Sequence, residues 1–435
     1  MRPSRAHGAS WPERVTSTGL MVTLVIVGEF IAPSAAHGQT SAPVTILVDQ
    51  DLTMATGTSD VLALERGLAV LEDRLLLTHF SEATPLTHGF GIGYRVGKWL
   101  AVDLPQDSFL MVVAHEVFGH GARLREVGAP DVHYSFDAPL PYGDGDAVTI
   151  FNGTAAMTRA DVLGIDSAGI EAQNVLADQI GEQAFRRRTW SYRDSWLYLQ
   201  SRMAGLLYIR SVSPGSPPGH DVADFLHDFN SGCEPPVCTP LQASTLKRRA
   251  LLMLGDPLLA FSAYGFAVAY LSHGETTSTV PGIQLPNGWR YLPAMGFAMT
   301  AYGTAWTTEH NLSVGDRLTR VSLRIGEAGA THTWSIGVRS MSFAGGGPIS
   351  ADLSAEVWRQ PPLDAPPTSK TLSAGALAAA TVRVALGHRT SSRLRLTGQA
   401  GYKSTGFVPA EPLRSGPLVR VGITIALDDT SPATP

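Results

Sequence analysis

The sequence predicts an α+β protein, in which a mainly helical half precedes a C-terminal antiparallel β half that forms a barrel or a partial barrel. From about Thr45 to Gly274 the apolar residues recur mostly with the helical period, and from about Gly288 onward they alternate with period two. The 435 residues carry a net charge of -5, which lacks the basic excess that nucleic-acid binding requires. We expect a signal peptide over 1–38, a helical domain over 39–287, a β domain over 288–428 and a disordered tail over 429–435.

The N-terminus has the features of a secretory signal. Arginines precede an apolar stretch at 19–31, and small residues follow up to about Gly38, where cleavage is expected. Glu29 interrupts the apolar stretch, so an uncleaved membrane anchor is the alternative. In an exported protein the two cysteines, Cys233 and Cys238, favour a local disulfide over a metal pair. These features indicate a periplasmic or outer-membrane location.

The helical half contains several apolar-periodic segments separated by Pro, Gly and Asp. We expect helices at 108–127, 167–185, 195–212, 221–229 and 246–271. The apolar run at 251–271 is nearly long enough to span a bilayer, but Asp256 and Pro257 interrupt it, which favours buried core helices over a membrane span.

The β half alternates apolar and polar residues over six or seven segments. In 320–325, for example, Val321, Leu323 and Ile325 face away from the arginines and serine between them. Strands of about ten residues with one apolar face match a small outer-membrane barrel, whose lipid-facing side is apolar. A soluble antiparallel sheet packed on the helical half shows the same alternation and is the alternative. Since a closed barrel has eight strands or more, some would have to come from the first half.

The most informative motif is His115-Glu116-Val117-Phe118-Gly119-His120, within the helix expected at 108–127. Two neutral imidazoles can ligate Zn²⁺, and the glutamate between them can accept a proton from a bound water. Histidines five residues apart lie about 140° apart on an ideal helix and could not share one metal. A π-helical widening at Phe118 and Gly119 would bring them together. The motif therefore predicts both a zinc site and a distorted helix.

A zinc site needs a third protein ligand, and Glu171 on the helix expected at 167–185 is our candidate. Small residues around Glu171 would let that helix approach the motif closely. Asn174 and Asp178 follow on the same helix, where they could orient a ligating imidazole through its free N–H. In the alternative interpretation Glu171 is a carboxylate near a helix N-terminus, stabilised by the helix dipole.

The motif is similar to the H-E-x-x-G-H signature of the dipeptidyl peptidase III family of zinc peptidases. That resemblance covers the motif and the second helix, and it implies His115, His120 and Glu171 as zinc ligands and Glu116 as the catalytic base of a zincin-like domain. A helical half followed by a barrel-like C-terminus also looks like uncharacterised exported bacterial proteins with an H-E-x-x-x-H motif. The first resemblance implies a zinc metallopeptidase that hydrolyses peptide or protein substrates. The second supports the exported, barrel-like architecture, for which we expect contact with outer-membrane lipid.

Other assignments are open or excluded. Either His133 or Tyr134 could donate to the oxyanion of a tetrahedral intermediate, but the preferred interpretation of each is an ordinary loop residue. The glycines of 88–93 lack the context of a nucleotide-binding motif and predict turns or a strand, so we expect no nucleotide. The acidic helix at 221–229 is interpreted as a solvated face, with a second metal site as the alternative.

The rival function is a non-enzymatic outer-membrane barrel protein with a structural or metal-binding helical part. An intramembrane protease is disfavoured because charged residues at 123–126 follow the motif too soon for a membrane span.

Overall fold

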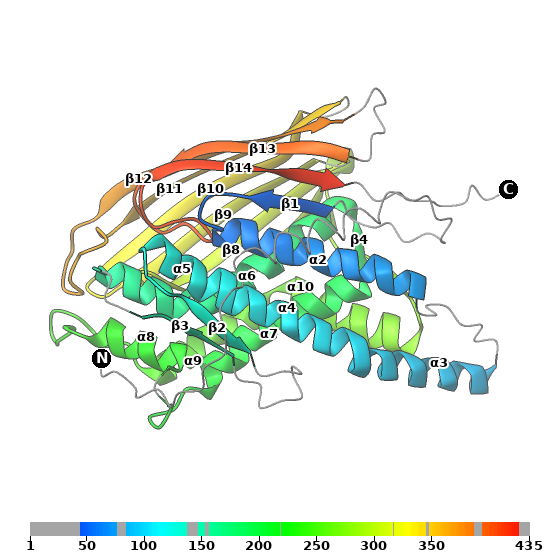
Figure 1. The fold of residues 1–435 in the computed structure, drawn as a ribbon, viewed down its shortest axis with the longest axis horizontal. Helices are drawn as coiled ribbons and strands as arrows, with labels where there is room; N and C mark the ends of the chain where they lie inside the picture. The colour runs from blue at the N-terminus through cyan, green and yellow to red at the C-terminus, as the bar shows by residue number, and fades with distance from the viewer. Residues whose placement is uncertain are drawn as a thin grey trace. The chain divides into compact units, whose positions relative to one another are not determined.

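The computed structural model describes residues 44–75, 84–136, 147–152, 156–217, 219–315, 317–344, 348–386 and 394–425. The expected signal peptide and C-terminal tail lie outside the described residues. Within the compact unit Gln39–Asp429 the predicted α+β class is confirmed, since helices fill the first half and a large antiparallel sheet fills the second. Figure 1 shows the sheet as one layer lying over the helices.

The first half contains a long helical stretch that carries the motif, followed by the helix that packs on it. Its elements are β1 (Val44–Val48), α2 (Met54–Leu75), α3 (Pro85–Lys98), η1 (Trp99–Asp103), α4 (Leu104–His115), η2 (Glu116–His120), α5 (Gly121–Glu126), β2 (His133–Phe136), β3 (Ala147–Ile150) and α6 (Arg159–Arg187). They continue with β4 (Thr189–Ser191), α7 (Tyr192–Ser211), α8 (Asp221–Asn230), α9 (Ala243–Ala250), η3 (Leu251–Gly255), α10 (Pro257–Tyr264), η4 (Gly265–Ser272), β5 (Thr277–Thr279), β6 (Ile283–Gln284) and η5 (Pro286–Gly288).

Helix boundaries differ from the expected ones for local reasons. The helical stretch that carries the motif starts at Pro85 rather than at 108. Pro105 has no backbone N–H to donate, but the π-helical turn η1 directly before it keeps the backbone helical at this point. The glycines of 88–93 are therefore helical, and the expected turns or strand there were wrong. Helix α6 starts earlier than expected because Thr158 and Asp161 form a capping box.

The apolar run at 251–271 is divided as its sequence predicts. Asp256 accepts a hydrogen bond from the N–H of Leu258 and caps α10 directly after the 3₁₀ turn η3. Among the described residues, no single helix is long and apolar enough to cross a bilayer. The segments Ala243–Gly255 and Pro257–Ser272 reach that length and apolarity only together, and they are bent by 64°.

The second half contributes most of a 10-stranded sheet whose order is β1-β14-β13-β12-β11-β10-β9-β8-β7-β6. Its strands are β7 (Arg290–Thr300), β8 (Gly303–Val314), β9 (Arg317–Ala328), β10 (Thr331–Ala344), β11 (Ile349–Gln360), β12 (Ser373–Ala385), β13 (Leu394–Lys403) and β14 (Gly416–Ile425). Sequence analysis missed β7 and β8, whose alternation is weak. We expected strands from the first half as a requirement of a closed barrel. In the structure β1 pairs with β14, with Val44 opposite Ile425, so the first half does add a strand to this sheet (Figure 1).

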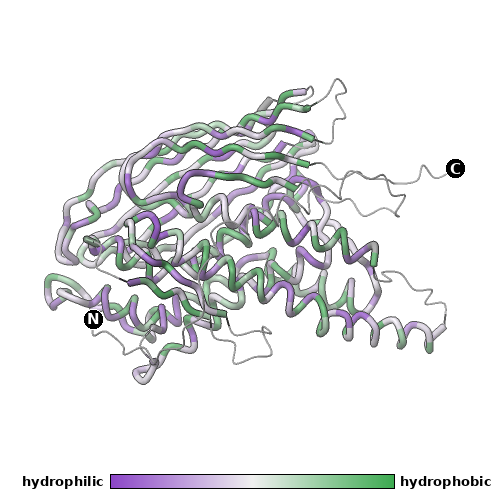
Figure 2. The backbone as a smooth tube through the Cα atoms, in the orientation of Figure 1, coloured by the Kyte–Doolittle hydropathy of each residue, from purple (hydrophilic) through white to green (hydrophobic). Residues whose placement is uncertain are grey.

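The sheet face turned toward the helices buries charged residues among apolar ones, and the face turned away from them is apolar. Arg324, Asp352 and Arg420 are buried on the inner face, and the alternation of the strands is visible in Figure 2. The side chains that are exposed on the opposite face, which we call the outer sheet face, include Trp306, Ile325, Trp334, Ile336, Val338, Leu353, Val357, Val382, Val384, Leu396, Val419, Val421 and Ile423. This arrangement is the reverse of a water-facing sheet.

Candidate metal centre

The motif adopts the distortion that its spacing requires. Residues Glu116–His120 form the π-helical turn η2 within an otherwise continuous helix, so the predicted widening at Phe118 and Gly119 is confirmed. The extra residue in this turn brings the two histidines to the same side of the helix. Their Nε2 atoms lie 3.3 Å apart.

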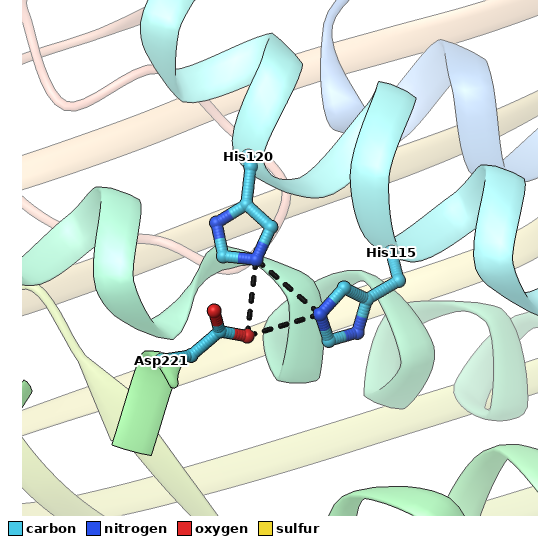
Figure 3. Close-up of side chains that lie close together, drawn as sticks. All are labelled: His115, His120 and Asp221. Carbon is cyan, nitrogen blue, oxygen red and sulfur yellow. Dashed lines mark hydrogen bonds and ion pairs between the residues drawn. The ribbon is translucent and has the colours of Figure 1, made fainter. Parts of the chain in front are cut away.

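Three side chains converge on one point, as Figure 3 shows. The carboxylate Oδ2 of Asp221, at the start of α8, lies 3.0 Å from His115 Nε2 and 3.1 Å from His120 Nε2. Zinc bonds of about 2.0–2.2 Å in tetrahedral geometry separate ligand atoms by roughly 3.3–3.6 Å. The His₂Asp set is therefore close to the dimensions of a zinc site and leaves one coordination position open.

The position of His120 is fixed by its second nitrogen. The backbone oxygen of Ile165 on α6 lies 2.7 Å from His120 Nδ1, which directs Nε2 toward the cluster. Burial disfavours the imidazolium, but the charge of Asp221 and its hydrogen bond outweigh this effect and raise the pKa of His120 to about 9. Burial likewise opposes the Asp221 carboxylate, and the two histidines lower its pKa.

Two glycines allow α6 to approach the motif. A Cβ on Gly169 would lie 2.2 Å from His115 Nε2, and one on Gly119 would lie 2.7 Å from the backbone oxygen of Ala168. The small residues of 168–172 therefore bring the two helices together as predicted. Their close contact places the His115 ring against a bare backbone, which fixes its orientation.

Glu116 lies beside the cluster without joining it. Its Oε1 is 4.0 Å from His115 Nε2, and its Oε2 accepts a hydrogen bond of 2.6 Å from Thr149 Oγ1 on β3. The hairpin of β2 and β3 thus orients the carboxylate that the sequence assigns as the base. Because Glu116 stays outside the ligand set, it remains available for proton transfer.

Glu171 does not lie with the histidines. Its carboxylate accepts hydrogen bonds of 2.7 and 3.0 Å from Arg123 NH2, and a third of 2.8 Å from the backbone N–H of Ala410. Glu171 also lies well inside α6, so the helix-dipole alternative does not describe it either. The structure corrects the third candidate ligand from Glu171 to Asp221.

The two residues expected to orient an imidazole are also placed elsewhere. Arg202 on α7 donates to Asn174 at 2.9 Å and to the carboxylate of Asp178. Both residues therefore tie α6 to α7. The orienting acceptor is the Ile165 carbonyl instead, and a backbone oxygen leaves no side-chain signal in the sequence.

Among the candidate oxyanion donors, Tyr134 is engaged elsewhere and Tyr208 is better placed. The hydroxyl of Tyr134 accepts a hydrogen bond of 2.8 Å from Arg125, and His133 is exposed. The Tyr208 ring packs edge-on against His115, and its hydroxyl accepts a hydrogen bond of 3.2 Å from the backbone N–H of Asp221. Burial and the nearby Asp221 charge raise the pKa of Tyr208, so the hydroxyl keeps its proton. Sequence analysis did not single out Tyr208.

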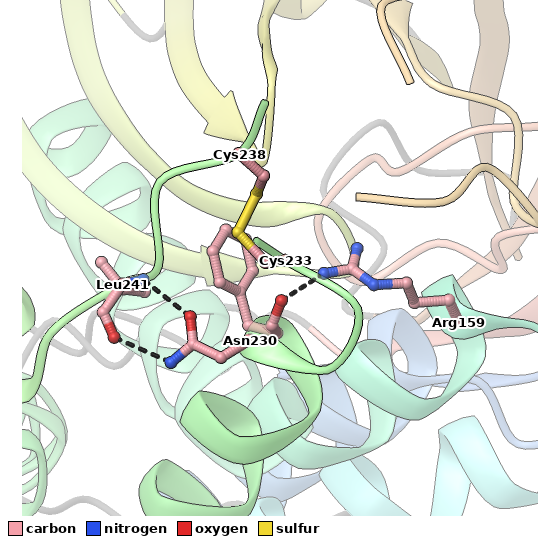
Figure 4. Close-up of a disulfide and its surroundings, with 6 residues drawn as sticks. Arg159, Asn230, Cys233, Cys238 and Leu241 are labelled. Atoms are coloured by element: carbon pink, nitrogen blue, oxygen red, sulfur yellow. Dashed lines mark hydrogen bonds between the residues drawn. A yellow bond between two sulfur atoms is a disulfide. The ribbon is translucent and has the colours of Figure 1, made fainter. Parts of the chain in front are cut away.

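The C-terminal end of α8 is anchored, which steadies the helix that carries Asp221. The predicted disulfide between Cys233 and Cys238 is confirmed (Figure 4). Asn230 exchanges two hydrogen bonds with the backbone of Leu241, at 2.7 and 3.0 Å, across the same loop. Helix α8, which we interpreted as a solvated acidic face, supplies Asp221 to the cluster.

No family model, curated protein or solved structure matches the chain. The residues and their geometry therefore carry the functional argument.

Proposed function

We propose that the chain is an exported, membrane-associated zinc metallopeptidase with His115, His120 and Asp221 as metal ligands and Glu116 as the catalytic base. The observation that carries this proposal is the convergence of the three ligand atoms within 3.3 Å of one another, next to the Glu116 carboxylate, which lies outside the ligand set. The similarity of the motif to that of the dipeptidyl peptidase III family supports it independently of the third ligand.

The residues divide the chemistry between them. Zinc bound at this cluster would polarise the substrate carbonyl and lower the pKa of a coordinated water toward about 7. Glu116, held by Thr149, accepts the proton of the attacking water and delivers it to the leaving amine. The protonated Tyr208 hydroxyl is the candidate donor to the developing oxyanion. A peptide bond is the substrate that this combination of groups suits best.

The export part of the proposal rests on other features. The N-terminal arginines and apolar stretch are typical of a secretory signal, and the Cys233–Cys238 disulfide suits an oxidising compartment. The apolar outer sheet face supports attachment to outer-membrane lipid.

The test combines zinc analysis with peptide hydrolysis. Purified protein should contain one zinc per chain and cleave a mixed library of quenched fluorescent peptides. We expect Glu116→Gln to keep the zinc and lose the cleavage, with Asp131→Asn on the surface as the control. Zinc without cleavage in the unchanged protein would favour the non-enzymatic outer-membrane alternative. Absence of zinc would refute the metal assignment.

A further inference from the structure

The helices α2, α3 and α10–η4 have an inverted distribution of side chains. On α2, Leu64, Leu71 and Leu75 are exposed, while Glu65 and Glu72 on the same helix are buried. The three exposed leucines are spaced seven and four residues apart, so they form one stripe along the helix. A helix in water buries its apolar stripe and exposes its charges. Helix α2 buries Met54, Val61 and Leu62 in the core, but it also buries these charges and leaves the leucine stripe exposed.

The helical stretch from α3 into η1 repeats this pattern. Leu86 is 84% exposed, Phe90 is 68% exposed and Leu100 is 41% exposed, whereas Lys98 and Asp103 are buried. These exposed positions again share one face at helical spacing. Exposure of Leu and Phe side chains to water is unfavourable, because the hydrophobic effect favours their removal from water. The stripe is thus costly in water and favourable in hydrocarbon.

In α10–η4, the face turned outward is apolar throughout. Its exposed residues are Ala260, Ala263, Tyr264, Ala267 and Val268, and no charged residue occurs between Pro257 and Ser272. A helix that is apolar on all sides is buried in a core or in a membrane. One side of α10–η4 is exposed and is therefore not buried in the core of the protein.

The charges of these helices meet in the interior. Lys98 Nζ lies 2.7 Å from Asp103 and 2.5 Å from Glu72, and Glu72 also lies 2.8 Å from Arg193 on α7. In membrane proteins, ionisable side chains face the bundle interior and pair with one another. Buried ion pairs inside an apolar exterior are therefore present in the helical layer, as buried charged residues are in the sheet.

The apolar faces lie next to one another around the unit. The turn η3 packs on β7, η4 packs on α3, and α2 packs on both α4 and β1. Together with the outer sheet face, the helices thus surround a shared interior that contains these buried ion pairs. A second copy that covered a standard interface of about 800 Å² per partner could reach only one of these faces. The hydrocarbon of a bilayer contacts all of them at once.

We infer that α2, α3 and α10–η4 face lipid hydrocarbon together with the outer sheet face, so that the helices complete a lipid-exposed perimeter that the sheet alone does not close. This goes beyond the membrane attachment of the proposed function, and it does not depend on the metal centre. It also places the candidate metal centre in a body that is surrounded by lipid.

The test is site-directed spin labelling of the full chain in phosphatidylethanolamine and phosphatidylglycerol vesicles. Both native cysteines are in the disulfide, so an introduced cysteine is the only free thiol. Labels are placed by Leu71→Cys on α2, Leu86→Cys on α3 and Val268→Cys on η4, with Val357→Cys as the reference on the sheet. Arg210→Cys and Gln242→Cys, at exposed polar positions, are the aqueous controls.

Oxygen concentrates in hydrocarbon, whereas a nickel chelate stays in water. We expect the labels at positions 71, 86 and 268 to have a collision rate with oxygen several-fold above that with the chelate. The Val357→Cys label on the sheet should show the same ratio. The controls should show the reverse ratio. Helix labels that behave like Arg210, or that are shielded from both reagents by a protein partner, would overturn the inference even if Val357 remains in lipid. In that case the proposed membrane attachment would stand, and zinc content measured on the same samples reports on the metal centre separately. Leu64→Cys and Tyr264→Cys repeat the test if a first variant does not fold.

Discussion

The exchange of Glu171 for Asp221 as third ligand predicts opposite consequences for two carboxylate deletions. Glu171→Ala removes the partner of a buried arginine, since the Arg123 and Glu171 side chains are each only 4% exposed. Asp221→Ala removes a candidate zinc ligand. The two variants should therefore separate stability from metal binding.

The cost of Glu171→Ala follows from its contacts. Breaking a buried ion pair costs about 3–5 kcal/mol, because the remaining charge cannot return to water. Arg123 keeps Glu126 at 3.1 Å and the carbonyl of Glu411 at 2.8 Å, which favours the lower end of that range. The N–H of Ala410 also loses its acceptor, at a further cost of about 1 kcal/mol. We expect the free energy of unfolding to fall by about 4 kcal/mol, with the zinc content unchanged.

Asp221→Ala should lower stability less, because its partner can adapt. His120 can release its proton when the carboxylate is lost, whereas an arginine cannot. We expect a loss of about 1 kcal/mol in metal-free protein together with loss of the bound zinc. The stabilisation that zinc gives to the unchanged protein, about 4 kcal/mol at a thousand times Kd, should also disappear.

The assay is chemical denaturation in detergent with and without a chelator, combined with zinc analysis by mass spectrometry. Glu171→Gln is the matched control, since it retains the shape and an acceptor for Ala410. A zinc-free Glu171→Ala with an unchanged unfolding midpoint would refute this assignment of roles. So would an Asp221→Ala variant that still holds one zinc.

Further predictions concern the surroundings of the cluster. Gly169→Ala should push the His115 ring aside and weaken zinc binding about 10–100-fold in a chelator competition, and unchanged affinity would contradict the close approach of the helices. Tyr208→Phe should keep the zinc and lower kcat about 10²-fold with little change in KM, and a normal kcat would exclude the oxyanion role. In metal-free protein, burial and the charges of Asp228 and Asp224 raise the pKa of Asp166 to about 8. Because the folded state then holds a proton that the unfolded state releases above about pH 4, the free energy of unfolding should fall as pH rises from 4 to 8, by at most about 5 kcal/mol for this group. Asp166→Asn should flatten that fall in denaturation measured between pH 5 and 9, and an unaltered slope would contradict it.

Much of the fold could be predicted from local patterns. The change from helical to alternating period at about Gly288 predicted the change from helices to strands, since periodicity records which faces are buried. The disulfide of Cys233 and Cys238 followed from their nearness in sequence. The weak alternation of β7 and β8 concealed those strands, because their residues pack on helices rather than against a uniform environment.

In the candidate site, the sequence determined the part that is local. His115, Glu116 and His120 lie on one helix, and the spacing of the histidines required the π-helical turn that the structure contains. The small residues of α6 predicted a close contact with that helix. Both inferences depend only on backbone geometry over a few residues.

Only the tertiary structure decided the third member of the cluster and the surroundings of its helices. Asp221 is 101 residues from His120 in sequence, and its role depends on where α8 packs. Glu171 was an equally good candidate by residue type, but Arg123 faces it in the folded chain and holds its carboxylate. In the same way, the sequence supplied apolar stripes on α2, α3 and α10–η4, and folding decided that they face outward. Residue type and spacing specify what a side chain can do, whereas packing specifies what it meets.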